Sequence, residues 1–128
     1  MARGIEIRDA HFPGRAPLDA YGNGGFRFAD MSHRGSLLCL PSGVHGWDFA
    51  EGEPLAVSAF KRVFEEAKDI EVLLVGTGNN IVFLPEPLRQ RMRDSQIICD
   101  AMSTGAAVRT YNVMLAESRA VAAALVAV

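Results

Sequence analysis

The sequence predicts a single α/β domain over residues 1–128, with a mixed central β-sheet and helices packed on it. Three observations lead to this fold class. The length of 128 residues, 49% of them hydrophobic, supplies one core and leaves too little chain for two. The second half alternates short apolar runs with helical patterns, which is typical of parallel strands joined by right-handed crossovers. The first half carries strand patterns separated by turn residues, which indicates antiparallel pairing.

The first forty residues contain strand patterns around one long loop. Residues 5–8 alternate isoleucine with charged side chains, which is the period of a half-buried strand. Residues 9–24 are rich in glycine and proline and predict a loop that is unusually long for a small domain. Residues 26–28 alternate again, and residues 36–40 are almost continuously apolar. We expect the last two segments to form an antiparallel hairpin, with ADMSHRG between them as turn residues.

The middle of the chain predicts the first helix. Proline and glycine break the preceding strand pattern, and Trp47 follows in a short extended piece or loop, where we expect it to join the core. The helix begins at Pro54, because proline is tolerated in a first turn. Its polar face carries the pairs Lys61/Glu65 and Arg62/Glu66 at i,i+4 spacing. Its apolar face consists of Ala56, Phe60, Val63, Ala67 and Ile70.

The segment after this helix alternates strand and helix. Residues 72–75 (VLLV) form an unbroken apolar run, as expected for a central strand that is covered on both faces. Residues 85–94 predict a brief helix with Leu88 and Met92 facing inward and arginines facing solvent. Residues 96–102 predict a further buried strand.

The final segment, residues 103–128, has the longest helical pattern. Ser103 is well placed as its N-cap. We expect an unbroken helix through the apolar run 120–128, which is too short to span a membrane. This helix should pack across adjacent strands at 37–40, 72–75 and 97–99. Its buried face would consist of Ala107, Tyr111, Met114, Ser118, Val121, Leu125 and Val128.

Composition excludes several classes of protein. The net charge of -2 and the pI near 5.9 indicate neither a nucleic-acid-binding protein nor attraction to an anionic membrane. The first residues lack the apolar region of a secretory signal, so we expect a cytoplasmic protein. Cys39 and Cys99 lie in apolar segments and are expected to be free and buried. The three histidines have no paired spacing, so we expect no metal site.

Gly76, Thr77 and Gly78 follow the buried strand, at the position where open α/β sheets bind ligands. The third glycine of a dinucleotide fingerprint would fall at position 81, which is Ile81, and the lysine of a P-loop is missing. We therefore expect no nucleotide cofactor. The turn either meets a polar group through its backbone N–H groups and the Thr77 hydroxyl, or is a plain turn.

Arg109 is the most suggestive charged residue, because apolar residues surround it and no carboxylate lies three or four residues away. It is either a solvated arginine with a packed stem or a clamp for an anion or a carbonyl group. Thr110 and Asn112 are residues that helices use sparingly, so they indicate a polar seam or a kink.

The predicted site combines these two segments. We expect the turn at 76–78 and residues 109–112 to line one cleft into which Arg109 reaches. Trp47 or Tyr21 would form a wall of the cleft.

Four pieces of sequence carry a resemblance to a known family: YGNGGFRF, GSLLCLPSGVHGW, VLLVGTG and MSTGAAVRTYNVMLAESRAVAAAL. In this order they resemble the small domain-of-unknown-function family, of Mth type, that includes a mitochondrial complex I assembly factor and an adipogenesis-associated protein. The resemblance covers nearly the whole chain. It implies a three-layer α/β fold and an assembly or regulatory role rather than an established reaction. The positions that match the family's motifs are Gly76, Thr77, Gly78, Arg109, Thr110, Tyr111 and Asn112.

Two functions are expected from these observations. The first is a non-catalytic binding or assembly protein with a protein partner, such as a component of respiratory-chain or membrane-protein biogenesis. The predicted cleft can bind but has no evident proton carrier, which acid–base catalysis requires. The alternative is a small-molecule enzyme, for which His33, His45 or Asp100 would have to fold beside Arg109. No transmembrane segment is expected, and we expect the chain to lack the mitochondrial targeting segment of the organellar members.

Overall fold

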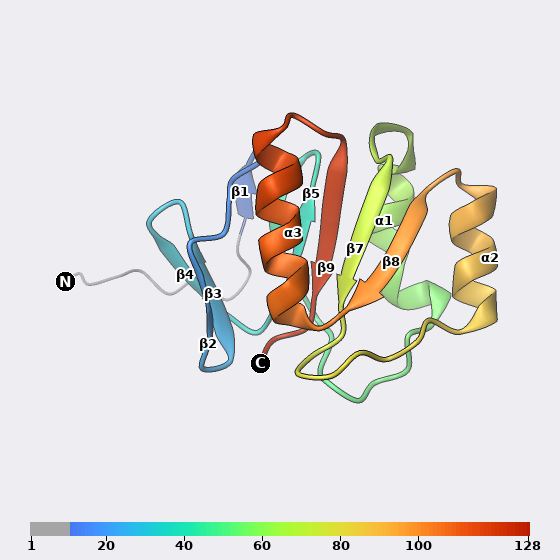
Figure 1. The fold of residues 1–128 in the computed structure, drawn as a ribbon, viewed down its shortest axis with the longest axis horizontal. Coiled ribbons are helices and arrows are strands. Elements are labelled where there is room, and N and C mark those ends of the chain that lie inside the picture. The colour runs from blue at the N-terminus through green and yellow to red at the C-terminus, as the bar shows by residue number, and fades with distance from the viewer. Residues whose placement is uncertain (1–10) are drawn as a thin grey trace.

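The computed structural model describes residues 11–128, and the predicted strand at 5–8 lies outside this range. The chain forms one six-stranded sheet in the order β1-β6-β5-β9-β7-β8 and one three-stranded sheet, β2-β3-β4 (Figure 1). The strands of the large sheet are β1 (His11–Pro13), β5 (Ser36–Leu40), β6 (Gly43–Trp47), β7 (Val72–Gly76), β8 (Ile98–Met102) and β9 (Val121–Leu125). The strands of the small sheet are β2 (Ala20–Gly22), β3 (Gly25–Phe28) and β4 (Met31–Arg34).

The large sheet is mixed, which confirms the predicted fold class. Strand β7 is parallel to both β8 and β9, whereas β5 is antiparallel to both β6 and β9. The five residues of β7 are buried, and their side chains alternate between the two faces of the sheet. Leu73 and Val75 pack in the core on one face, and Val72 and Leu74 pack in the core on the other. A strand apolar on both faces needs cover on both sides.

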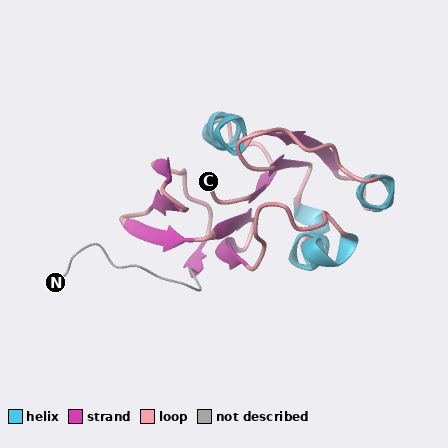
Figure 2. Ribbon diagram, turned by 90° about the horizontal axis from the view of Figure 1, so that it is seen from below, coloured by secondary structure: helices cyan, strands magenta, loops and turns pink. Residues whose placement is uncertain are grey.

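Helices supply that cover in two outer layers (Figure 2). On one face lie α1 (Lys61–Glu65), with the 3-10 turns η1 (Val57–Phe60) and η2 (Ala67–Asp69) on either side of it, and α2 (Glu86–Asp94). On the other face lie α3 (Thr104–Ala116) and the small sheet, which contributes Phe26 and Phe28 to the core beneath α3.

The predicted C-terminal helix is wrong beyond residue 116. Helix α3 ends at Ala116, Ser118 adopts a positive φ of 59°, and the chain returns as strand β9. All five residues of β9 are buried between β5 and β7. Because such a strand is apolar on both faces, its sequence lacks the alternation of apolar and polar residues that marks a strand. Its three alanines also have a high helix propensity, which favours the helical interpretation. The prediction that 37–40 and 72–75 are neighbours is wrong for the same reason, since β9 separates them.

The predicted hairpin of residues 26–28 with 36–40 is also wrong. Strand β3 pairs with β4, which lies inside the segment interpreted as turn residues. The connection is Ala29–Asp30, and both residues have positive φ, 48° and 62°, as a tight two-residue hairpin turn requires. This turn carries no glycine, so the sequence did not mark it.

Two other predictions need correction. The helix expected from Pro54 is a short α-helix between two 3-10 turns, and Ala56 of its predicted apolar face is exposed, although Phe60, Val63 and Ile70 are buried. The strand expected to be buried at 96–102 is the edge strand β8, whose residues are only partly covered.

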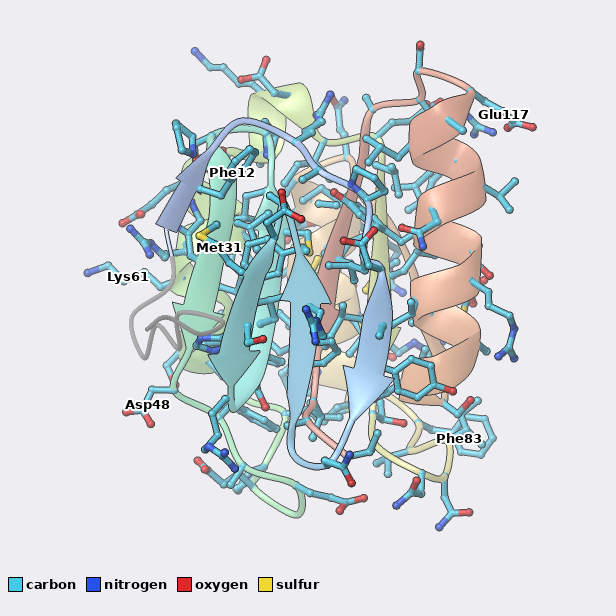
Figure 3. The ribbon with its side chains drawn as sticks, turned by 90° about the vertical axis from the view of Figure 1, so that its left-hand side faces the viewer. Phe12, Met31, Asp48, Lys61, Phe83 and Glu117 are labelled. Carbon is cyan, nitrogen blue, oxygen red and sulfur yellow. The ribbon has the colours of Figure 1, made fainter. Side chains whose placement is uncertain are left out.

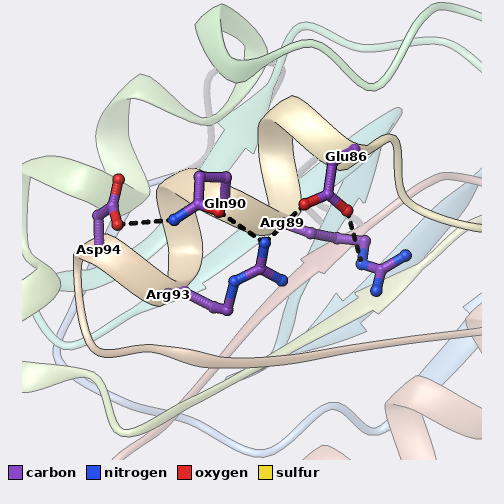
Figure 4. A network of polar contacts seen from close by, with 5 residues as sticks. All are labelled: Glu86, Arg89, Gln90, Arg93 and Asp94. Atoms are coloured by element: carbon purple, nitrogen blue, oxygen red, sulfur yellow. Dashed lines mark hydrogen bonds and ion pairs between the residues drawn. The ribbon is translucent and has the colours of Figure 1, made fainter.

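Helix α2 agrees with the prediction. Leu88 and Met92 are buried, and the outer face carries a polar network (Figure 4). In this network Arg93 Nη2 donates to a Glu86 carboxylate oxygen at 2.6 Å and to Gln90 Oε1 at 2.8 Å. Ser103 caps α3 as predicted, because its Oγ accepts a hydrogen bond from the N–H of Ala106 at 3.3 Å.

Candidate functional site

The turn after β7 meets the first turn of α3 at the carboxyl edge of the parallel strands. A Cβ on Gly76 would lie 2.8 Å from Thr104 Cα, so the helix packs directly on the glycine backbone. Gly78 has a φ of 113°, a conformation that residues with a side chain rarely adopt. Close packing therefore explains Gly76, and backbone conformation explains Gly78.

The Thr104 side chain joins three segments at this edge. Its hydroxyl accepts a hydrogen bond from the N–H of Gly78 at 3.0 Å and donates to the carbonyl oxygen of Val126 at 2.7 Å. Its own N–H donates to the Gly78 carbonyl oxygen at 2.8 Å. Thr104 is fully buried, so these groups have no access to water. The Gly78 N–H, which the sequence offered as a ligand donor, is engaged inside the protein.

Thr77 holds the loop that follows. Its Oγ1 accepts a hydrogen bond from the N–H of Val82 at 2.9 Å and lies 2.7 Å from the carbonyl oxygen of Asn80, to which it donates. The loop thereby folds over the buried Thr77 and exposes three consecutive apolar residues. We call these residues, Ile81, Val82 and Phe83, the apolar loop.

The apolar loop is the feature of this edge that the sequence did not identify. Ile81 and Val82 are each 50% exposed and Phe83 is 81% exposed. Figure 3 shows Phe83 at the same end of the molecule as the first turn of α3. The sequence shows only that this run is apolar. Its position between Asn79–Asn80 and Pro85, which favour turns, was the available signal that it is a loop.

The predicted residues on α3 have separate environments. Arg109 is exposed, and its Nη1 lies 3.6 Å from the position of a Cβ on Gly105, so it extends back toward the first turn of the helix. Asn112 Oδ1 accepts from the N–H of Leu18 at 2.9 Å, and its Nδ2 donates to the Leu18 carbonyl oxygen at 2.8 Å. Asn112 thus attaches the segment before the small sheet to α3. Thr110 is partly buried.

Tyr21 and Trp47 lie on different parts of the molecule. A Cβ on Gly105 would collide with the hydroxyl of Tyr21, which therefore covers the start of α3. Trp47 is buried, its Nε1 donates to the Ala59 carbonyl oxygen at 2.9 Å, and its ring stacks on Phe49 with centroids 4.5 Å apart. Trp47 serves the core on the α1 side of the sheet.

The enzyme alternative requires His33, His45 or Asp100 beside Arg109, and these three residues lie on β4, β6 and β8. His33 lines a polar pocket of about 410 Å³ with Arg34, Asp48 and Glu53, and its Nε2 lies 3.0 Å from the Ser36 carbonyl oxygen. His45 Nε2 lies 2.9 Å from Ser42 Oγ. His45 on β6 and Asp100 on β8 are separated in the sheet by β5, β9 and β7. Within residues 11–128, no group of three His, Cys, Asp or Glu side chains could hold a metal ion.

The cysteines are free, as predicted. Burial raises the pKa of the Cys39 thiol from 9.0 to about 12, although a hydrogen bond with Tyr111 lowers it in part. Burial, followed by the charge of Asp100, raises the pKa of Cys99 to about 12. Burial also raises the pKa of Tyr111 above its usual range. The thiols are therefore neutral at physiological pH.

We expect Cys39 to react with a thiol reagent at pH 8 more than about 100-fold more slowly in the folded chain than in urea, because little thiolate forms. Half-buried Cys99 should react faster than Cys39. Both thiols have a higher pKa in the folded state than in the unfolded state. The stability that the folded state gains from the two protonated thiols is therefore complete below pH 9 and is lost as the pH rises toward 12. The measurement is the rate of modification at each cysteine by mass spectrometry. A Cys39 rate equal to that of the unfolded chain would contradict this account.

The fold is a three-layer α/β domain, and the turn after β7 is followed by an exposed apolar loop that is hydrogen-bonded to Thr77. Residues 18–126 match the family described as a protein of unknown function (DUF498/DUF598), and the chain belongs to this family.

Its relatives include one with a named role. An uncharacterised protein of Rhodobacter capsulatus is 36% identical over 118 residues, which cover 92% of this chain and 90% of that protein. The mouse protein named NADH dehydrogenase [ubiquinone] 1 alpha subcomplex assembly factor 3 is 28% identical over 122 residues, 95% of this chain. The chain spans 66% of the length of the mouse protein.

Solved structures agree with the fold. A Bartonella henselae protein described as an outer membrane protein is 62% identical, with a TM-score of 0.88 over 91% of this chain and 98% of that one. A Bordetella pertussis protein described as a Mth938-like domain has a TM-score of 0.74 at 24% identity, over 87% of this chain and 85% of that one, and shows the fold alone. None of the helices in residues 11–128 is long and apolar enough to cross a membrane.

Proposed function

We propose that this protein is a non-catalytic binding protein that takes part in the assembly of a respiratory complex. The observation that carries the proposal is the apolar loop, which holds Ile81, Val82 and Phe83 in solvent. The name of the mouse relative supports an assembly role. A cytoplasmic location, on the side where new subunits become available, is part of the same proposal.

The apolar loop has the properties of a protein-binding element. Burial of exposed apolar surface stabilises a complex by roughly 25 cal/mol of free energy per Å². Phe83 alone is 81% exposed, so a partner with an apolar pocket would gain most of the burial energy of a phenylalanine. The hydrogen bonds of Thr77 already order the loop, so little conformational entropy remains to be lost on binding.

The predicted site residues acquire roles in this proposal. Gly76, Thr77 and Gly78 act by shaping the loop rather than by touching a ligand. Arg109, which extends toward the same edge, adds a charged contact for the partner. Asn112 and Trp47 support the fold.

A Phe83→Ser variant tests the proposal. We expect it to recover respiratory-complex subunits from the native cell at least about tenfold less well than the natural chain, because a buried aromatic anchor commonly contributes 2 kcal/mol or more to an interface. The matched control is Val113→Ser, since Val113 is 58% exposed on the outer face of α3.

Quantitative mass spectrometry of cross-linked complexes gives the readout. Equal recovery by the Phe83→Ser variant and the natural chain would refute the role of the loop. Recovery of partners that contain no respiratory-complex subunit would refute the assembly role.

A further inference from the structure

Strand β8 forms one edge of the large sheet, and helix α2 lies beside it (Figure 1). The N–H of Ile98 donates to the Glu71 carbonyl oxygen at 2.9 Å, and the Met102 carbonyl oxygen accepts from the N–H of Thr77 at 2.8 Å. Residues 98, 100 and 102 therefore direct their backbone groups toward β7, and alternation directs those of Cys99 and Ala101 outward. Among residues 11–128, no strand lies beyond β8.

The side chains on the α3 face of β8 are poorly covered. Ile98 and Asp100 pair with Val72 and Leu74, whose side chains enter the core beneath α3. Helix α3 lies over β7 and β9, so β8 extends past it (Figure 1). Ile98 is 63% exposed, Asp100 is exposed and Met102 is partly buried. The row is thus apolar, acidic and apolar at alternate positions, and Ile98 and Asp100 are its exposed members.

The opposite edge of the sheet differs. Strand β1 ends in Pro13, which has no N–H to donate. Edge strands of natural proteins commonly carry charges and prolines that prevent pairing. Strand β8 lacks proline and exposes a large apolar side chain.

A second copy of the chain is disfavoured at this edge in the register that pairs the outward-facing residues of β8 with one another. Two β8 strands that pair antiparallel about a twofold axis, and use both outward-facing residues, place Cys99 opposite Ala101. The same register places Asp100 opposite Asp100. Like charges directly opposite one another destabilise a strand pair. The charge of Asp100 therefore selects against self-pairing and favours a cation.

We propose that β8 is a docking edge for an extended segment of a partner protein that adds a strand to the sheet. The segment carries lysine or arginine opposite Asp100 and an apolar residue two positions to either side, facing Ile98 and Met102. Backbone hydrogen bonds to Cys99 and Ala101 supply affinity, and the alternate side chains supply specificity. None of the residues of this surface belongs to the apolar loop.

A labelled peptide, Thr-Val-Thr-Lys-Thr-Val-Thr, provides the probe, and fluorescence anisotropy with the full chain provides the measurement. We expect saturable binding that weakens about tenfold when the lysine of the peptide is replaced by glutamate, because attraction becomes repulsion. The Asp100→Lys variant should reverse this preference. A reversal distinguishes pairing at Asp100 from a general effect on the fold.

Ala101→Pro removes an outward N–H without removing a hydrogen bond to β7, and it should abolish peptide binding, whereas Ala101→Ser should retain it. The amides of Cys99 and Ala101 should gain protection from hydrogen exchange when the peptide binds. Phe83→Ser should leave peptide binding unchanged, which separates this test from that of the proposed function. The proposal would be overturned if Asp100→Lys did not reverse the charge preference, or if the amides of Cys99 and Ala101 gained no protection. It would also be overturned if the chain formed a dimer without peptide and Ala101→Pro dissociated that dimer, because the edge would then bind a second copy.

Discussion

A chain carrying Thr104→Val is expected to unfold with a free energy about 2–4 kcal/mol lower than that of the natural chain. Valine keeps the shape and the β-branch of threonine but lacks the hydroxyl group. The Gly78 N–H and the Val126 carbonyl oxygen would then be left unpaired next to a fully buried side chain. Each unpaired buried group costs roughly 1–3 kcal/mol, which gives the expected size.

Urea unfolding followed by circular dichroism measures this effect, and Thr104→Ser is the matched control because serine retains the hydroxyl. The serine variant should recover most of the loss. A Thr104→Val variant that loses less than about 1 kcal/mol of unfolding free energy would show that the hydroxyl is not the junction described above.

Leu125→Ala should lower the free energy of unfolding by about 2–5 kcal/mol, through lost burial and the cavity that remains. Leu125 is 0% exposed in β9 and packs in the core beneath α3. Leu125→Ile keeps the volume of the side chain and should cost less than about 1.5 kcal/mol.

The same denaturation experiment compares the two leucine variants. The isoleucine control also examines the conformation of this segment, because β-branched residues are tolerated well in strands. A loss for Leu125→Ala no larger than that for the isoleucine variant would contradict the buried position of Leu125.

The sequence predicted those elements of the fold in which the pattern of apolar residues matches their burial in the structure. The run Val72–Val75 has no polar residue and forms an interior strand, and Leu88 with Met92 defines the buried side of α2. Strand β9 was missed because burial on both faces removes the alternation that marks a strand, and alanine favours helices by propensity. The strand at Met31–Arg34 was missed because its turn, Ala29–Asp30, lacks the expected glycine.

The candidate site was less predictable because the role of each polar side chain depends on hydrogen bonds that the folded structure determines. Thr77 was identified as important, but only the structure shows that its hydroxyl bonds to its own loop. Asn112 looked like a ligand-binding residue, yet it bonds to Leu18, which is 94 positions away in the sequence. Exposure of Phe83 could not be predicted from its hydrophobicity, since apolar residues are also found at protein surfaces.

The central place of β9 has a consequence for synthesis of the protein. Strand β9 leaves the ribosome after the other described strands, yet it joins β5 to β7 and so connects the antiparallel and parallel halves of the sheet. Until residue 125 emerges, each half has an unpaired apolar edge that β9 later covers. Completion of the sheet in the nascent chain must therefore await residues 121–125, and shorter nascent chains expose the kind of edge that promotes aggregation.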